Sequence, residues 1–155
     1  MTQEEKQLLL KDICARLPYG VKVWYKYYPI NITEKFATSI RLVDNKIALS
    51  SKFTKEGSWH PIEESGEILI KPYLRHMSSM TEEEYKEFSK ISGLWKKEEG
   101  NYFSNHLSEL GNSIITERVI VRTIDWLNSH YFDYRGLIPM GLALEAPEGL
   151  YKKSS

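Results

Sequence analysis

The stretch from Ile120 to Pro147 reads IVRTIDWLNSHYFDYRGLIPMGLALEAP and does most to decide the predicted fold. It begins with the spacing of an amphipathic helix, and Gly136 suits the left-handed residue that ends a helix or closes a tight turn. The apolar run after this glycine is too hydrophobic to stay in water. We therefore expect a helix that ends between His130 and Gly136, an aromatic and charged turn, and a tail that packs against the rest of the chain.

The helix of this stretch should run from about residue 116 to residue 131, with Ser113 or Thr116 as its cap. The β-branched run at 119–121 would also suit a strand, but the spacing of the apolar residues favours a helix. The inward stripe of this helix is predicted to consist of Ile120, Ile124, Leu127 and Tyr131.

The turn is the first candidate binding surface. Arg135 carries a planar fork of donors close to Asp133 in the sequence, so we expect it to pair with a carboxylate or with the helix-terminal carbonyls. An aromatic ring with a polar tip, partly exposed beside a fixed charge, is typical of binding hot spots. A corner that only holds the fold together is the alternative. The candidate residues are Trp126, Tyr131, Asp133, Tyr134 and Arg135.

The composition is that of one globular domain. The chain has 155 residues, of which 41% are hydrophobic and 27% charged, and this length suits a single core. Lys plus Arg and Asp plus Glu both number 21, so the formal net charge is zero. No overall field then draws the protein to nucleic acid or to an acidic membrane. We expect one domain over residues 1–151 and a polar tail at 152–155.

Cys14 is the only cysteine, which excludes an intramolecular disulfide and a cysteine-rich zinc site. We expect it to be a small buried hydrophobic residue. The N-terminus is polar and unlike a secretion signal, and no apolar run is long enough to cross a bilayer. The cytoplasm is therefore the expected location.

The first helix has clear boundaries. Thr2 with Glu5 forms a capping box at its start, and Pro18 ends it. Its apolar stripe is predicted to consist of Leu9, Leu10, Ile13, Cys14 and Leu17.

Residues 21–28 alternate in character and are rich in strand formers, so they predict a strand. One face mixes cations with aromatic rings, a combination that single-stranded nucleic acid could use. A solvent face whose lysine stems cover the rings is the plainer interpretation. The candidate nucleic-acid face comprises Lys22, Trp24, Lys26, Tyr28 and, from the next hairpin, Arg41.

The dipeptide Asp-Asn at 44–45 tolerates the backbone angles of a tight turn and predicts a β-hairpin between Ala37 and Ser50. A two-residue loop would pair Val43 with Lys46. That register places on one face Ile40, Leu42, Ile47 and Leu49, and on the other Arg41, Lys46 and Ala48.

The remaining segments complete an α+β pattern. Residues 29–35 and 51–66 are polar and predict connections, and residues 67–71 predict a further strand. A second capping box at Thr81 opens a helix over 81–91. We expect a single small domain in which an antiparallel or mixed sheet of about four strands is covered by about three helices.

No motif dictates a reaction. The four histidines are scattered, and the chain contains no metal-binding spacing, nucleophile elbow, phosphate loop or dinucleotide fingerprint. His130 with Asp133 could form half a metal site, although a histidine at a helix end is a commoner arrangement. The glutamates at 82–84 would point in different directions on a helix. We predict no catalytic residue, no metal and no cofactor.

Three groups of segments carry a resemblance to known sequences. They are LLLKD (8–12) with CARLPYGV (14–21), KPYLR (71–75) with SSMTEEE (78–84), and DWLN (125–128) with FDYRGLI (132–138) and GLALEAPEG (141–149). In these segments the chain resembles a family of small, functionally uncharacterised proteins common in gut Bacteroides genomes and their phages. The resemblance implies a bacterial cytoplasm or a resident mobile element. It carries over no activity and no site residue.

Three classes of function remain open. The favoured one is a non-enzymatic protein-binding accessory factor that acts on a host or phage protein, or on a second copy of itself. The chain contains 10 Tyr and 4 Trp against 5 Phe, and such amphipathic rings anchor protein interfaces. The alternatives are a nucleic-acid-binding protein and an enzyme without a local motif. A nucleic-acid titration at varied salt tests the first alternative, because phosphate contacts depend steeply on salt.

Overall fold

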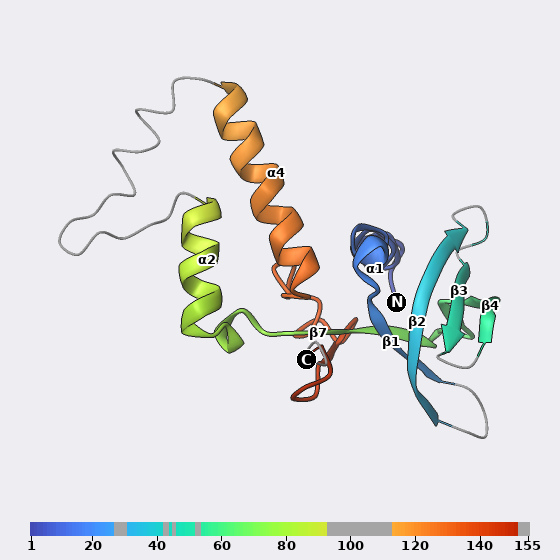
Figure 1. Cartoon of the computed structure of the whole chain (residues 1–155). Helices are drawn as coiled ribbons and strands as arrows, with labels where there is room; N and C mark the ends of the chain where they lie inside the picture. The colour runs from blue at the N-terminus through green and yellow to red at the C-terminus, as the bar shows by residue number, and fades with distance from the viewer. Residues whose placement is uncertain (27–30, 42–43, 45, 52–53, 93–112, 152–155) are drawn as a thin grey trace.

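The computed structural model describes residues 1–26, 31–41, 44, 46–51, 54–92 and 113–151 (Figure 1). In chain order its elements are α1 (Gln3–Arg16), η1 (Leu17–Tyr19), β1 (Lys22–Lys26), β2 (Asn31–Arg41), β3 (Lys46–Ser51), β4 (Thr54–Pro61), β5 (Glu63–Glu64), β6 (Glu67–Ile68), β7 (Ile70–Leu74), η2 (Met77–Ser79), α2 (Glu82–Ser92), α4 (Ser113–Ser129) and β8 (Leu144–Glu145). These elements form an α+β fold, which confirms the predicted class.

The N-terminus of α1 has the predicted capping box. Glu5 N donates to Thr2 Oγ1 over 3.1 Å, and Thr2 N donates to Glu5 Oε2 over 2.7 Å, so two otherwise unpaired amides are satisfied. Pro18 lies in η1, and Gly20 at φ 73° turns the chain into β1. The buried apolar residues of α1 are Leu9, Leu10 and Ile13.

The prediction that Cys14 is buried was wrong, because its side chain is exposed. The buried side of α1 passes instead through Asp12, Ile13 and Arg16. Successive helical residues are rotated by about 100°, so Cys14 lies roughly opposite Asp12 on the helix. The buried stripe is therefore partly charged.

The main sheet has six strands in the order β4-β3-β2-β1-β7-β8. All neighbours are antiparallel except β7 and β8, which run parallel. In β1, Val23 pairs with Lys35 of β2 on one side and with Pro72 of β7 on the other. The chain thus returns to the sheet through β7, which lies beside β1, before it continues to η2 and α2 (Figure 1).

Two segments that were predicted as connections contain strands. The loop expected at 29–35 already belongs to β2 from Asn31 onward, and the connection expected at 51–66 contains β4. These strands are defined by backbone pairing with β1 and β3. Polar strands are common where main-chain bonds to neighbours supply the pairing, so hydrophobic alternation does not reveal them. The strand expected at 67–71 is observed as β6 and β7.

The predicted hairpin between β2 and β3 is present, but its register was wrong by two residues next to the turn and by three beyond a bulge between Ala37 and Ser39. Lys46 pairs with Arg41 and not with Val43. Between the turn and this bulge, a shift of two preserves the face of each side chain, because strand side chains alternate with period two. Ile47 and Leu49 are accordingly buried as expected.

Ala48 was expected on the solvent face and is buried as well. It lies on β3 with β2 on one side and β4 on the other, where Trp59 is its pairing partner. The side chain of Ile40 and the whole of Leu42 lie outside the described residues.

α1 packs against the sheet, whereas α2 and α4 pack against each other beside it (Figure 1). This arrangement differs from the expectation that both later helices would cover the sheet. The reason is that β7 continues out of the sheet into η2 and carries α2 away from it. The main core lies between α1 and the central strands, a second cluster surrounds the C-terminal tail, and a third lies between α2 and the end of α4.

α4 is a helix and not a strand, as predicted, and it spans Ser113–Ser129. Leu127 is buried, but Ile120 is 56% exposed, so the expected inward stripe was wrong at Ile120. Among the described side chains of α4, those near its C-terminal end contribute to the third cluster, namely Ile124, Trp126 and Leu127. The N-terminal part therefore leaves apolar side chains uncovered.

Candidate functional site

The turn after α4 is held by backbone hydrogen bonds to β7 that were not predicted from the sequence. Gly136 has a φ of 74°, as expected, but Tyr131 also adopts a positive φ of 62°. A tyrosine in this conformation is uncommon. The residue is fixed because Arg75 N donates to Tyr131 O over 2.8 Å and Asp133 N donates to Arg75 O over 2.8 Å. The turn is thereby bound to the end of β7.

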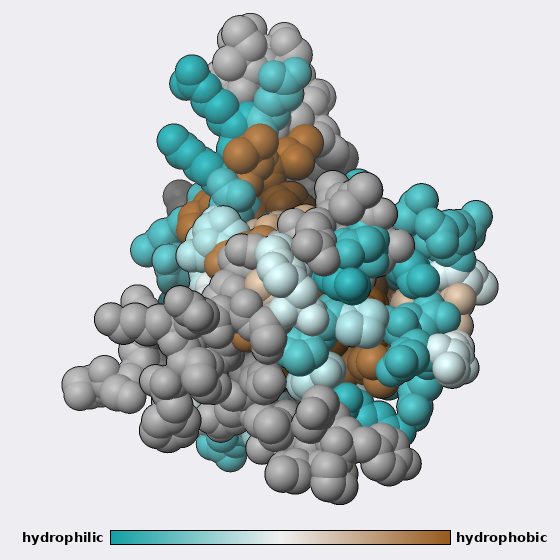
Figure 2. Space-filling view, turned by 90° about the vertical axis from the view of Figure 1, so that its right-hand side faces the viewer, coloured by the Kyte–Doolittle hydropathy of each residue, from teal (hydrophilic) through white to brown (hydrophobic). Residues whose placement is uncertain are grey.

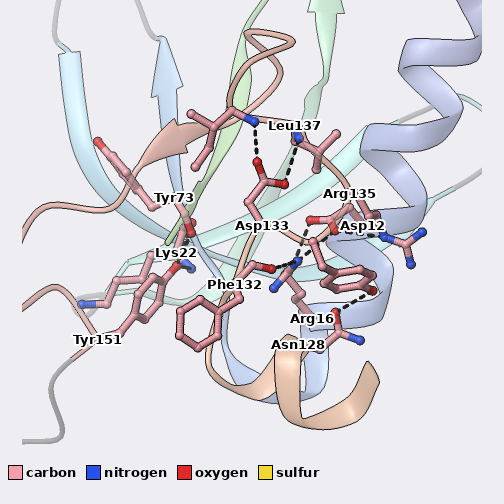
Figure 3. A network of polar contacts seen from close by, with 12 residues as sticks. Asp12, Arg16, Lys22, Tyr73, Asn128, Phe132, Asp133, Arg135, Leu137 and Tyr151 are labelled. Atoms are coloured by element: carbon pink, nitrogen blue, oxygen red, sulfur yellow. Dashed lines mark hydrogen bonds and ion pairs between the residues drawn. The ribbon is translucent and has the colours of Figure 1, made fainter. Parts of the chain in front are cut away.

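Asp133 organises the tail from inside the turn. It is 8% exposed, and its two carboxylate oxygens accept hydrogen bonds of 2.8 Å from Leu137 N and from Ile138 N (Figure 3). Charge-assisted bonds of this kind are stronger than those between neutral groups. Both oxygens are used in this way, so the possible pairing of Asp133 with His130 is not observed. His130 Nδ1 instead lies 2.9 Å from Trp126 O.

A buried ion pair on α1 lies directly beneath the turn. Asp12 and Arg16 are both 0% exposed, and they are joined by contacts of 2.8 Å at Nε and 3.1 Å at Nη2. Arg16 Nη2 also donates to Phe132 O over 2.8 Å (Figure 3). Removing two charges from water is costly unless their geometry is good and their remaining donors are bonded. Arg16 Nη1 has no hydrogen-bond partner in the structure, so this pair is not fully satisfied.

Arg135 pairs with a carboxylate, as predicted, and the carboxylate is that of Asp12. Its Nε lies 3.2 Å from Asp12 Oδ1, within ion-pair range but without the angle of a hydrogen bond. Its guanidinium lies 4.9 Å from the centre of the Tyr134 ring, and that of Arg16 lies 5.5 Å away. The Tyr134 hydroxyl donates to Asn128 Oδ1 over 3.1 Å. Tyr134 is half-buried, in line with the expectation of partial exposure.

The roles of Asp12 and Arg16 were not predicted from the sequence. A signal was present, because both residues fall at helical spacing on the stripe that contains Leu9 and Ile13. Charged residues at such positions, four apart and of opposite sign, indicate a buried pair that reaches another element.

Trp126 belongs to the interior and not to the surface, with 6% of it exposed. Its ring centre lies 4.0 Å from that of His130, 5.7 Å from that of Phe132 and 5.3 Å from that of Phe88 in α2. These contacts of an aromatic cluster are worth more than their buried area alone. Trp126 therefore joins α4 and the turn to α2.

Arg75 makes a second connection to α2. Its guanidinium lies 4.3 Å from the centre of the Phe132 ring. It also donates to both carboxylate oxygens of Glu84, over 2.7 Å and 2.8 Å. These hydrogen bonds lower the pKa of Glu84 to about 2. Glu84 Oε2 also accepts from Thr81 N over 2.9 Å, which confirms the second capping box.

The segment formed by η2 and α2, which Trp126 and Arg75 connect to the turn, carries an open groove of about 570 Å³. Met77 and Tyr85 in its lining are 39% and 51% exposed, while Met80 and Phe88 are partly buried in the third cluster. The lining residues are Met77, Met80, Thr81, Glu82, Tyr85, Lys86 and Phe88. We refer to this feature as the η2–α2 groove. The sequence predicted α2 and its cap but not this groove.

The candidate nucleic-acid face has the expected alternation. Lys22, Trp24 and Lys26 are half-buried between buried neighbours, so Trp24 is not fully buried. Lys22 Nζ donates to Leu150 O over 2.8 Å, and Lys26 forms an ion pair with Glu67. The two lysines are thus engaged within the protein. Two further members lie outside the described residues, namely Tyr28 and the side chain of Arg41.

The five candidate residues of the turn lie close together in the structure. Their main contacts are with one another and with α1, β7 and the tail. In the described ranges, no group of three or more His, Cys, Asp and Glu side chains could hold a metal ion. None of the helices there is long and apolar enough to span a bilayer. No family model, curated protein or solved structure matches the chain. The resemblance to the Bacteroides family therefore stays a prediction.

Proposed function

We propose that the protein is a non-enzymatic protein-binding module and that it binds an apolar segment of another protein in the η2–α2 groove. One observation carries this proposal. Six large hydrophobic residues are exposed in the described part of the chain, and two of them, Met77 and Tyr85, meet in this one groove. Exposed apolar residues that gather in a hollow are typical of interaction sites, whereas scattered ones are not.

The chemistry of the lining suits a peptide segment. Methionine is unbranched and polarisable and adapts to irregular apolar surfaces. The rings of Tyr85 and Phe88 offer rigid contact area, and aromatic residues and methionine are enriched at interfaces. Glu82 and Lys86 supply one charge of each sign along the groove. This combination suits an amphipathic helix or strand whose apolar side chains enter the groove while its polar side chains stay in water.

The turn after α4 supports the groove from behind. Phe88 rests on Trp126, and Arg75 links Phe132 to Glu84 at the start of α2. A groove held by such contacts loses little conformational entropy when it binds, which favours affinity. In this proposal the predicted binding residues of the turn act by positioning α2. Tyr134 and Arg135 as direct contacts remain the alternative.

The test uses a displayed library of random peptides selected on the immobilised protein. Met77→Ser should weaken the selected binders about tenfold or more, because a buried contact of this size is worth roughly 1–3 kcal/mol. The matched control is Met140→Ser, since Met140 is 46% exposed against 39% for Met77 and does not line the groove. Equal losses in the two variants, or no loss in either, would refute the groove as the binding site.

The nucleic-acid alternative has weaker support. The formal net charge is zero, and Lys22 and Lys26 already have protein partners. The resemblance noted above leads us to propose a bacterial or phage protein as the partner, bound in the cytoplasm.

A further inference from the structure

The N-terminal half of α4 exposes the two least covered large hydrophobic residues in the described part of the chain. Ile120 is 56% and Val121 is 58% exposed. Figure 1 shows this half of α4 projecting past α1 and the sheet. In the view of Figure 2, hydrophobic surface lies over α4 near the top of the molecule, bordered by hydrophilic side chains. Adjacent aliphatic side chains left in water favour association, since burying each of them is favourable.

Two of the four exposed charged residues between positions 117 and 125 of α4 are arranged in a self-complementary way, namely Arg118 and Asp125. Arg118 and Asp125 are both exposed, and neither forms an ion pair with another residue that the structure describes. They are two helical turns apart, about 10.5 Å, so they share one side of α4 but cannot pair within it. Val121 lies near the middle between them, on an adjacent side of the helix.

We propose that this surface binds a second copy of the chain, with the two α4 helices packed antiparallel about a two-fold axis between residues 121 and 122. Arg118 and Asp125 are equidistant from that axis, so Arg118 of each copy faces the partner's Asp125. In antiparallel helix pairs, residues that flank the contact line on one side of a helix meet the residues that flank it on the same side of the partner helix. A two-fold axis relates the two copies, so each Arg118–Asp125 contact occurs twice.

Two further observations favour a second copy over an unrelated occupant. Arg118 and Asp125, which have no ion-pair partner among the described residues, match each other, acid to base, when this helix is turned around. The formal net charge of zero also removes the long-range repulsion between two identical molecules. This inference is independent of the η2–α2 groove, because it concerns different residues and a different partner.

Sedimentation of the purified full chain over a concentration series up to about 1 mM tests the proposal, since that range detects weak association. A dimer should form, and Arg118→Glu or Asp125→Arg alone should raise its dissociation constant about tenfold, because each change replaces two attractive contacts by two repulsive ones. The double variant Arg118→Glu/Asp125→Arg should restore dimerisation. A chain that stays monomeric throughout, or a dimer indifferent to the single reversals, would overturn it.

Crosslinking provides a measurement that does not depend on the charged variants. In a Cys14→Ser background, Val121→Cys should give a disulfide-linked dimer under mild oxidation, because the two copies of residue 121 lie close to the axis. Glu117→Cys is the matched control, since its two copies would lie about 13 Å apart along the helices and should not crosslink. Absence of the crosslink at 121, or equal crosslinking at both positions, contradicts the antiparallel arrangement.

Discussion

Replacing Asp12 by alanine tests the buried pair that ties α1 to the turn. The carboxylate of Asp12 is the counter-charge of two guanidinium groups, with contacts of 2.8 Å and 3.1 Å to Arg16 and 3.2 Å to Arg135. Without it, Arg16 stays fully buried and keeps only the carbonyl of Phe132 as a partner. Removing one member of a buried pair costs about 3–5 kcal/mol. That is a large part of the roughly 5–15 kcal/mol that stabilises a domain.

The size of the effect separates this explanation from simple loss of packing. A double variant, Asp12→Leu with Arg16→Met, removes both buried charges and restores apolar volume. One remaining cost is the carbonyl of Phe132, left without its donor, at about 1–3 kcal/mol. The other is the loss of the Arg135 ion pair, which the double variant shares with Asp12→Ala and which therefore cancels in the comparison. We therefore expect the double variant to be about 2 kcal/mol more stable than Asp12→Ala. The free energy of unfolding can be measured in urea by following the tryptophan fluorescence, to which the buried Trp126 contributes.

Two outcomes would refute this reasoning. If Asp12→Ala lost less than about 1 kcal/mol, the pair would behave like an exposed one. If the double variant were as unstable as the single one, the loss would come from packing on α1 and not from an uncompensated charge.

The remaining predictions concern the sheet, the tail and the cap of α2. The pKa of Glu84 lies at about 2, below its ordinary value of 4.5, so its ion pair with Arg75 stabilises the fold above about pH 4.5 and is lost as the pH falls toward 2. Urea titrations should show this loss in the wild type but much less of it in Arg75→Ala, and equal slopes would contradict it. Burial raises the pKa of Tyr151, whose neutral hydroxyl donates to Tyr73 O over 2.8 Å. Tyr151→Phe should therefore lower the free energy of unfolding by about 1–2 kcal/mol, and an unchanged melting temperature would show that this bond contributes nothing. Ile47 is 0% exposed, so Ile47→Asp should unfold the protein in circular dichroism, and a folded variant would place this residue elsewhere.

The sequence predicted best what depends on neighbouring residues. Both capping boxes are made by side chains three positions apart, and Thr2 with Glu5 and Thr81 with Glu84 form them as expected. Gly136 adopts the left-handed conformation for the same local reason. The α+β class followed from the order of such elements.

The sequence predicted less well what depends on distant partners. β2 and β4 are held by pairing across the sheet, which hydrophobic alternation does not encode. Ile120 is exposed because the contact between α2 and α4 lies nearer the C-terminal end of α4. Asp12 and Arg16 are buried because the turn around Phe132, more than 100 residues later in the chain, packs over them. The five turn residues were found because aromatic and charged side chains cluster there, but their inward orientation needed the structure.

The most direct test of the proposed groove uses the methionines, of which the chain has four. Labelled at their methyl carbons, they give one NMR signal each, and Met77 and Met80 line the groove while Met1 and Met140 do not. Titration with a peptide selected on the protein should shift the signals of Met77 and Met80 and leave that of Met140 in place. A peptide that binds and shifts Met140 while Met77 and Met80 stay unchanged would contradict the proposed groove.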